Sequence, residues 1–204
     1  MAAKKQIFFF LEDAAQEAIM PPLFARMVRD AGIGVDRFEF RVLSARGGDS
    51  IRAFEQFLIE IVGSSHLAPS ALVVGSDGNC KGHLVRRQQL QAIADAHPST
   101  SNVITAVPDP HVERWYMLDP AALAKVVGCS VVAAAPAYKC AKDHYKQLLR
   151  DAFRGSGVTP LLGGAEYGPE FADALNLYAA GKADAGLGDY IAQVKAWIKS
   201  EFAH

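Results

Sequence analysis

The chain has 204 residues, 50% of them hydrophobic, with 21 Lys and Arg against 22 Asp and Glu. This length and composition predict a compact domain with a sizeable core, and they exclude a disordered chain. The formal net charge of −1 excludes the overall basic field that marks many nucleic-acid-binding proteins, so any nucleic acid would be held by a local patch.

The first half of the chain alternates between strand-like and helix-like segments. Apolar runs predict strands over residues 6–11, 35–43, 71–75 and 102–107, and helical spacing predicts helices over 13–31, from 49 or 50 to about 63, and over 84–96. The pair Pro21 and Pro22 should start or kink the first helix. This order is typical of right-handed crossovers in a mostly parallel sheet, and uniformly apolar strands predict helices on both of its faces.

Beyond Pro108 the sequence becomes helical. Helices are expected over residues 111–118, 120–127, 140–154, 170–180 and 189–202, and residues 155–168 are expected to form a loop or hinge. We therefore expect a single compact unit, with an α/β core over residues 1–128 and a helical C-terminal extension over residues 129–204.

Acidic residues follow three of the expected strands. Glu12 ends the run IFFFL, Asp77 ends ALVVGS, and Glu113 follows NVITAVPDPH. The carboxyl ends of parallel strands meet at one crevice, where ligands bind. Carboxylate and amide oxygens suit Mg²⁺ or Mn²⁺, and Asn79 would face the same side as Asp77. The sequence therefore predicts that Glu12, Asp77 and Glu113 are catalytic and that they hold a metal together with Asn79.

Each acid also has a plainer interpretation. Glu12 would stabilise the start of the following helix through its dipole, and Asp77 would belong to an ordinary Asp-Gly turn capped by Asn79. Glu113 would form a surface pair with Arg114. Other residues are candidates for supporting the metal ligands through hydrogen bonds or for binding a phosphate. They are Glu17, Lys81, Arg86, His111, Lys142 and Glu166, with Lys139 as a further basic candidate. Solvated surface charge is the alternative for the basic residues.

The cysteine pattern bears on the compartment. Cys80, Cys129 and Cys140 are odd in number and contain no CxxC pair, which argues against a disulfide framework or a structural zinc site. Cys80 is expected to be incidental. A reducing cytoplasm is the expected location, because no signal-peptide-like segment or long apolar run indicates export or membrane contact.

The three acidic positions Glu12, Asp77 and Glu113, in this order, resemble the TOPRIM fold, the metal-dependent domain of topoisomerases, primases and nucleases of the OLD (overcoming-lysogenization-defect) class, whose nuclease branch has later acids. FFFLEDAAQE is similar to the family's strand ending in Glu, and LVVGSDGN to its strand ending in Asp-x-Asp. VPDPHVERWYMLDPAAL and GGAEYGPEFADALNLYAA resemble segments of small standalone bacterial TOPRIM-like proteins. The resemblance covers essentially the whole chain. Asp13, Asn79 and Asn176 depart from it, standing where the family has a glycine and two acids.

The resemblance implies a Rossmann-like, mostly parallel sheet of about four strands flanked by helices. It also implies a phosphodiesterase that uses divalent cations to cleave nucleic acid, paired with an ABC-class ATPase in phage defence. Two alternatives stay open: a catalytically degenerate module that binds an ATPase or nucleic acid, and a metal-dependent hydrolase of small phosphorylated molecules. The sequence does not decide whether the substrate is DNA or RNA or whether one or two metal ions bind. It also leaves open whether the chain forms a homo-oligomer.

Overall fold

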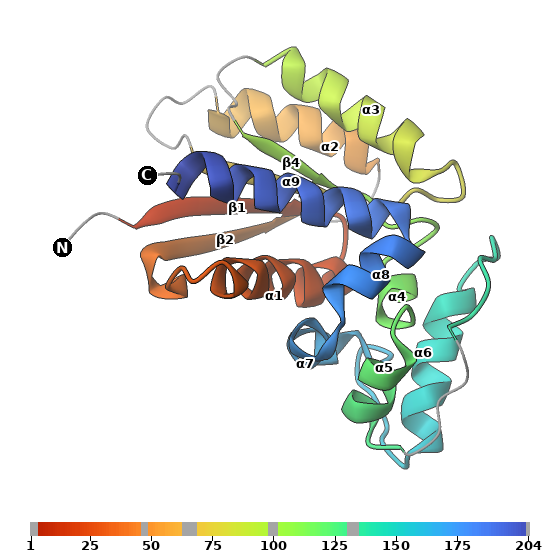
Figure 1. The fold of residues 1–204 in the computed structure, drawn as a ribbon. Coiled ribbons are helices and arrows are strands. Elements are labelled where there is room, and N and C mark those ends of the chain that lie inside the picture. Colours follow the sequence, from red (N-terminus) through yellow and green to blue (C-terminus); the bar gives the residue numbers. More distant parts are fainter. Residues whose placement is uncertain (1–3, 46–48, 63–68, 98–101, 130–134, 203–204) are drawn as a thin grey trace.

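The structure, a computed structural model, describes residues 4–45, 49–62, 69–97, 102–129 and 135–202 (Figure 1). The strands are β1 (Lys5–Leu11), β2 (Phe38–Ser44), β3 (Ala71–Gly75) and β4 (Val103–Ala106). The helices are α1 (Ala14–Asp30), α2 (Ser50–Phe57), α3 (His83–Asp95), α4 (Glu113–Tyr116), α5 (Pro120–Val127), α6 (His144–Gly155), α7 (Gly168–Ala174), α8 (Leu177–Ala183) and α9 (Ala185–Phe202). Short 3₁₀ turns cover Val35–Arg37 and Ala165–Tyr167, and a π turn covers Leu58–Val62.

The four described strands form one sheet in the order β2-β1-β3-β4, and every pairing in it is parallel. Phe9 of β1 lies between Val42 of β2 and Val73 of β3. The chain thus leaves β1 toward one edge of the sheet and later continues from β3 toward the other. Strand order reverses between β1 and β3, and in such sheets a crevice opens at the carboxyl ends of these two strands. The predicted α/β class with a four-stranded parallel sheet is confirmed.

Helices cover both faces of the sheet. Ile7, Phe9 and Leu11 of β1 belong to one buried cluster, which they share with α1 and α9. Phe8 and Phe10 point to the other face and join a second cluster with residues of α2 and α3. Successive side chains of a strand face opposite sides, so a continuous apolar run needs two covers. Figure 1 shows α2 and α3 on one side of the strands and α1 on the other.

The two prolines neither begin a new helix nor interrupt α1. Pro21 and Pro22 lie inside it, and proline has no N–H to donate. Pro22 therefore leaves the carbonyl of Ala18 without its intrahelical donor. Gly168, at the start of α7, packs so close that a Cβ there would lie 2.1 Å from this oxygen. The missing hydrogen bond and the missing side chain together permit α1 and α7 to pack closely.

Several element boundaries differ from the sequence prediction. Residues 35–37 form a 3₁₀ turn, so β2 begins only at Phe38. The helix expected over 170–180 is two helices, because Leu175 is extended and Asn176 caps α8 by accepting a hydrogen bond from the Ala179 N–H at 3.0 Å. The helix expected over 111–118 is the single turn α4. The expected helix end near Gly63, and positions 46–48 of the loop before that helix, lie outside the described residues.

Helices of the C-terminal half lie in two places, beyond the carboxyl ends of the strands and along one face of the sheet. Helices α4, α5 and α6 lie beyond the carboxyl ends of the strands (Figure 1). Helix α9 instead returns along the sheet, where Gln193 Oε1 accepts from the Thr105 N–H at 3.0 Å and Trp197 donates to the Ser70 carbonyl at 3.2 Å. Helical C-terminal structure is confirmed, and the division at residue 128 stays a prediction.

None of the described helices combines the length and apolarity that crossing a membrane requires.

Candidate active site

Glu12 and Asp77 lie next to one another at the crevice between β1 and β3. Glu12 is the residue after β1, and its Oε2 accepts from the Ser76 hydroxyl at 2.8 Å and from the Asp77 N–H at 3.0 Å. Asp77 follows β3 by two residues, and Ser50 at the start of α2 contacts Ser76. The parallel pairing of β1 with β3 sets this arrangement, because it brings both strand ends to one edge. The structure therefore brings together the first two predicted acids.

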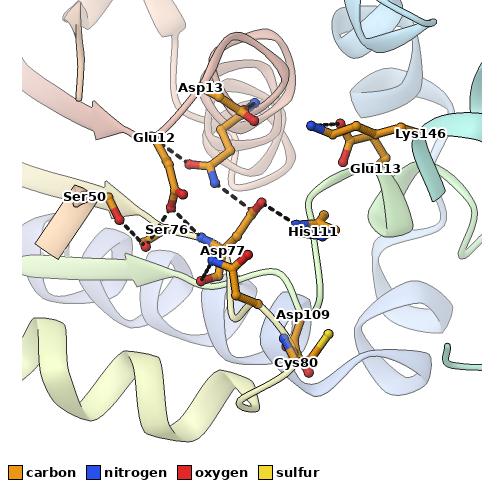
Figure 2. Close-up of polar contacts among 12 residues, drawn as sticks. Glu12, Asp13, Ser50, Ser76, Asp77, Cys80, Asp109, His111, Glu113 and Lys146 are labelled. Atoms are coloured by element: carbon orange, nitrogen blue, oxygen red, sulfur yellow. Dashed lines mark hydrogen bonds and ion pairs between the residues drawn. The ribbon is translucent and has the colours of Figure 1, made fainter. Parts of the chain in front are cut away.

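The carboxylate of Asp77 is buried and held from two sides. Gln16 Nε2 donates to Oδ1 at 2.9 Å, and His111 Nδ1 lies 2.9 Å from Oδ2 (Figure 2). Burial raises the pKa of Asp77, and the hydrogen bond to Asp77 raises the pKa of His111. We call Glu12, Gln16, Asp77 and His111 the sheet-edge group.

Gln16 is a site residue that the sequence prediction did not include. Its side chain is fully buried, and its Oε1 accepts from the Glu12 N–H at 3.0 Å while its Nε2 reaches Asp77. Gly75 makes room for it, since a Cβ there would lie 2.6 Å from Gln16 Oε1. The four-residue spacing from Glu12 was visible in the sequence, but the contact with Asp77 depends on which strands are neighbours.

Glu113 is buried but points away from the sheet-edge group. Figure 2 shows its side chain directed toward Lys146 of α6, and their closest N–O distance is 3.7 Å. Burial raises the pKa of Glu113, with Lys146 opposing that rise. The alternative of a surface pair with Arg114 is wrong, because Glu113 is buried and Arg114 instead forms an ion pair with the buried Asp184. Lys146 was not among the predicted residues.

Three other predicted residues have specific contacts near the strand ends. The Asn79 amide donates to the Asp77 carbonyl at 3.3 Å, and Asn79 is exposed. Arg86 Nε donates to the same carbonyl at 3.1 Å. Glu17 accepts from the hydroxyl of Ser44, at the end of β2. Asn79 and Arg86 therefore support the turn at Asp77 through its backbone, and Glu17 faces the neighbouring strand end.

The remaining predicted residues lie in loops or on the surface. Burial alone would raise the pKa of Glu166, but its carboxylate accepts from the N–H groups of Leu161, Leu162 and Gly164, and backbone hydrogen bonds together lower that pKa below its ordinary value. This bonding organises the loop before α7. The three lysines among the predicted residues, Lys81, Lys139 and Lys142, are exposed.

The expectation that the cysteines are unpaired is wrong for two of them. Cys80 and Cys140 form a disulfide, with their Cα atoms 5.7 Å apart. Their 60-residue separation gave no local pattern, because the pairing arises only when the segment before α6 folds back onto the turn after β3. The contacts beside the bond involve Asp109, whose carboxylate accepts from the Cys80 N–H and from the Tyr138 hydroxyl, each at 2.9 Å. The turn that holds Asp77 is therefore covalently joined to the segment that leads into α6.

The acids fit a hydrated cation better than a cage made of protein ligands. Among the described residues, no group of three or more His, Cys, Asp or Glu side chains could hold a metal ion. Mg²⁺, however, is commonly held by one or two carboxylates together with waters and substrate phosphates. The adjacent carboxylates of Glu12 and Asp77 provide hard oxygen donors of this kind. Coordination by Asn79 and Glu113 stays a prediction.

Comparison with known proteins gives little guidance on function. No protein-family model matches the chain, and no curated protein does. Among solved structures, it is similar to the C-terminal region of the Burkholderia pseudomallei OLD protein, with 15% sequence identity and a TM-score of 0.42. The match covers 97% of this chain and 98% of that one. A similarity at this level carries no conclusion about activity.

Proposed function

We propose that the chain is a Mg²⁺- or Mn²⁺-dependent phosphodiesterase that acts on nucleic acid. The observation that carries this proposal is the pair of carboxylates, Glu12 and Asp77, at the point where strand order reverses. A bound cation there would activate water and stabilise charge on a phosphate. Membership of the TOPRIM-like proteins, an ABC-class ATPase partner and a role in phage defence belong to the same proposal through the sequence resemblance. A cytoplasmic location is also part of the proposal, although the Cys80–Cys140 disulfide removes the cysteine pattern as a ground for it.

The chain's own residues would orient the reactive groups. Gln16 and His111 hold the Asp77 carboxylate from opposite sides, at 2.9 Å each, so its oxygens have a fixed direction. The Ser76 hydroxyl and the Asp77 N–H fix Glu12 in the same way. Such positioning favours catalysis because the groups need no reorganisation when the substrate binds.

Calorimetric titration with Mn²⁺ tests the cation site directly. Asp77→Asn keeps the shape of the side chain but removes the charge, and we expect it to abolish Mn²⁺ binding and metal-dependent cleavage of an oligonucleotide. Asp36→Asn is the matched control. Asp36 is an exposed acid in the turn before β2, so it lies at the amino end of that strand and not at the carboxyl ends where Glu12 and Asp77 lie. Undiminished Mn²⁺ binding and cleavage in Asp77→Asn would overturn the proposal.

A non-catalytic binding module is the second candidate. It is favoured because both oxygens of Asp77 already have protein partners and the Asn79 amide donates to a backbone carbonyl. This candidate predicts that the wild-type protein binds an oligonucleotide without cleaving it, and that Asp77→Asn binds it equally well. Cleavage by the wild type would exclude it.

A hydrolase of small phosphorylated molecules would use the same two acids. Competition between mononucleotides and oligonucleotides during turnover separates this candidate from a nuclease. Preferential turnover of the small molecules would support it.

A further inference from the structure

A pocket opens beside the sheet-edge group, between the first turn of α1, the start of α4, one face of α6 and the loop before α7. Its volume is about 290 Å³, and its charged lining residues are Asp13, Glu113, Lys146 and Arg150. We call this cavity with these four residues the α6 pocket. Asp13 follows Glu12 in the chain, and Glu113 is two residues beyond His111, so the pocket adjoins the proposed cation site.

The α6 pocket contains polar atoms that the protein leaves without partners. Glu113 Oε2 and Arg150 Nε are buried and have no hydrogen-bond partner, and among the described residues only Arg114 Nε shares that condition. The side chain of Glu113 is 6% exposed. Buried polar groups are nearly always paired in folded proteins. The side chains of Glu113 and Arg150 both line this cavity, so a bound molecule toward which they turn would supply the partners that these two atoms lack.

The charges of the pocket describe the kind of molecule that fits. Lys146 and Arg150 are four residues apart on α6 and therefore share a face of the helix. The first turn of α1 lines the same cavity, but the Asp13 carboxylate already caps that helix by accepting from the Gln16 N–H at 3.0 Å, so an external anion is left to Lys146 and Arg150. Asp13 and Glu113 balance the two cations. This balance suits a ligand that carries an anionic group at one end and hydrogen-bond donors at the other.

The size of the pocket limits the ligand further. Its volume lies just below the range of roughly 300–1,000 Å³ that is typical of small-molecule sites. One sugar phosphate would fill it, and the base and the neighbouring nucleotides would lie outside. Sugar hydroxyls are neutral donors that a buried carboxylate can accept from, and a phosphate is the anion that paired cations bind.

We infer that the α6 pocket binds one ribonucleoside phosphate unit, with the phosphate at Lys146 and Arg150 and the sugar hydroxyls at Glu113. This inference rests on the proposed function and narrows its substrate to ribonucleotides or RNA. It assigns Glu113 to substrate binding and leaves the cation to Glu12 and Asp77.

Calorimetric titration of the full chain with adenosine 5′-monophosphate (AMP), in the presence of EDTA, tests the inference. AMP should bind more tightly than its 2′-deoxy analogue, adenosine or inorganic phosphate. Lys146→Ala and Arg150→Ala should each raise the Kd for AMP roughly tenfold or more, the loss expected for a hydrogen bond to a charged group. Arg154→Ala is the control, because Arg154 is an exposed residue one turn further along α6 and does not line the pocket.

Glu113→Leu tests the hydroxyl contact, and the preference for AMP over the deoxynucleotide should disappear in this variant. Its thermal unfolding, compared with that of the wild type, verifies that it is folded. Absence of AMP binding to the wild type, an equal loss in Arg154→Ala, or an unchanged preference in folded Glu113→Leu would overturn the inference. No divalent cation is present, so a failure of the proposed cation site would not affect this result.

Discussion

Two groups of polar and charged residues lie beyond the carboxyl end of the sheet, and they differ in how many of their buried polar atoms have hydrogen-bond partners within the protein. In the sheet-edge group, Asp77 has a partner for each oxygen and Gln16 has partners for both of its polar atoms. In the α6 pocket, Glu113 and Arg150 each leave a buried atom unpaired. The protein itself therefore holds the first group in place, whereas the second has polar atoms whose partners the proposed ligand would supply.

The difference follows from the elements that build each group. Glu12, Asp77 and Gln16 of the sheet-edge group are positioned by the adjacent parallel strands β1 and β3 and by helix α1, which pack in the main hydrophobic cluster. The cations of the α6 pocket come from a helix that packs through Tyr145, Leu149 and Phe153 but leaves Lys146 half-exposed. The Cys80–Cys140 disulfide joins the two regions. Three changes, in order of decreasing expected effect, test this comparison.

Breaking the covalent link should have the largest effect. The Cys80→Ser/Cys140→Ser variant should lose roughly 4 kcal/mol of unfolding free energy, the value that loop-closure entropy gives for a loop of this size. Urea denaturation under oxidising conditions measures the loss. Dithiothreitol should destabilise the wild type by a similar amount and leave the double variant unchanged. Equal stability of the oxidised wild type and the variant would show that the disulfide does not hold the regions together.

Removing the amide of Gln16 should have the next largest effect. Gln16→Leu leaves the buried oxygen of Asp77 and the N–H of Glu12 without partners, at a cost of roughly 1–3 kcal/mol for such an unpaired group. Gln147→Leu is the control, because Gln147 is exposed on α6, and surface changes usually stay within about 0.5 kcal/mol.

The same variant distinguishes a positioning role of Gln16 from a purely structural one. If Gln16 orients Asp77, folded Gln16→Leu should bind Mn²⁺ more weakly than the wild type does in calorimetry. A destabilised variant with unchanged Mn²⁺ affinity would contradict that role and leave Gln16 as a packing residue.

The sequence predicted the sheet-edge group better than the α6 pocket, for a physical reason. The positions of Glu12 and Asp77 follow from local patterns, since each comes within two residues of the end of an apolar strand, and the carboxyl ends of parallel strands meet at one crevice. Lys146 has no comparable pattern, because its place depends on how the helical segment folds back over the strand ends. The disulfide was missed for the same reason, as it closes over that long-range contact.

The sequence predicted those helices and strands whose apolar pattern continues over many residues. It did not predict a boundary that depends on a single side chain. The apolar strands and the long helix α1 are continuous patterns, so their existence was read correctly. Asn176, by contrast, divides the expected helix over 170–180 through a single capping hydrogen bond.

The smallest expected effect is the change of the unfolding free energy with pH that Glu113 causes. It shows whether the folded protein favours the neutral or the ionised form of the Glu113 carboxyl. Burial raises the pKa of Glu113 above its ordinary value of 4.5. Below pH 4.5 the carboxyl is protonated in both the folded and the unfolded chain. As the pH rises above 4.5, the Glu113 carboxyl ionises in the unfolded chain first, which lowers the free energy of the unfolded state. The unfolding free energy of the wild type therefore decreases until the pH passes the raised pKa of the folded state.

Glu113→Gln cannot ionise and should not show this loss. The unfolding free energy of the variant minus that of the wild type should therefore increase between pH 4.5 and neutrality, as measured by urea denaturation across that range. Glu170→Gln, which changes an exposed glutamate of α7, should give a difference that does not increase with pH. A difference that is flat or falls with pH for Glu113→Gln would mean that the ionised carboxylate is stabilised in the folded protein. The α6 pocket would then be satisfied internally, like the sheet-edge group, because Lys146 would fully compensate the buried charge.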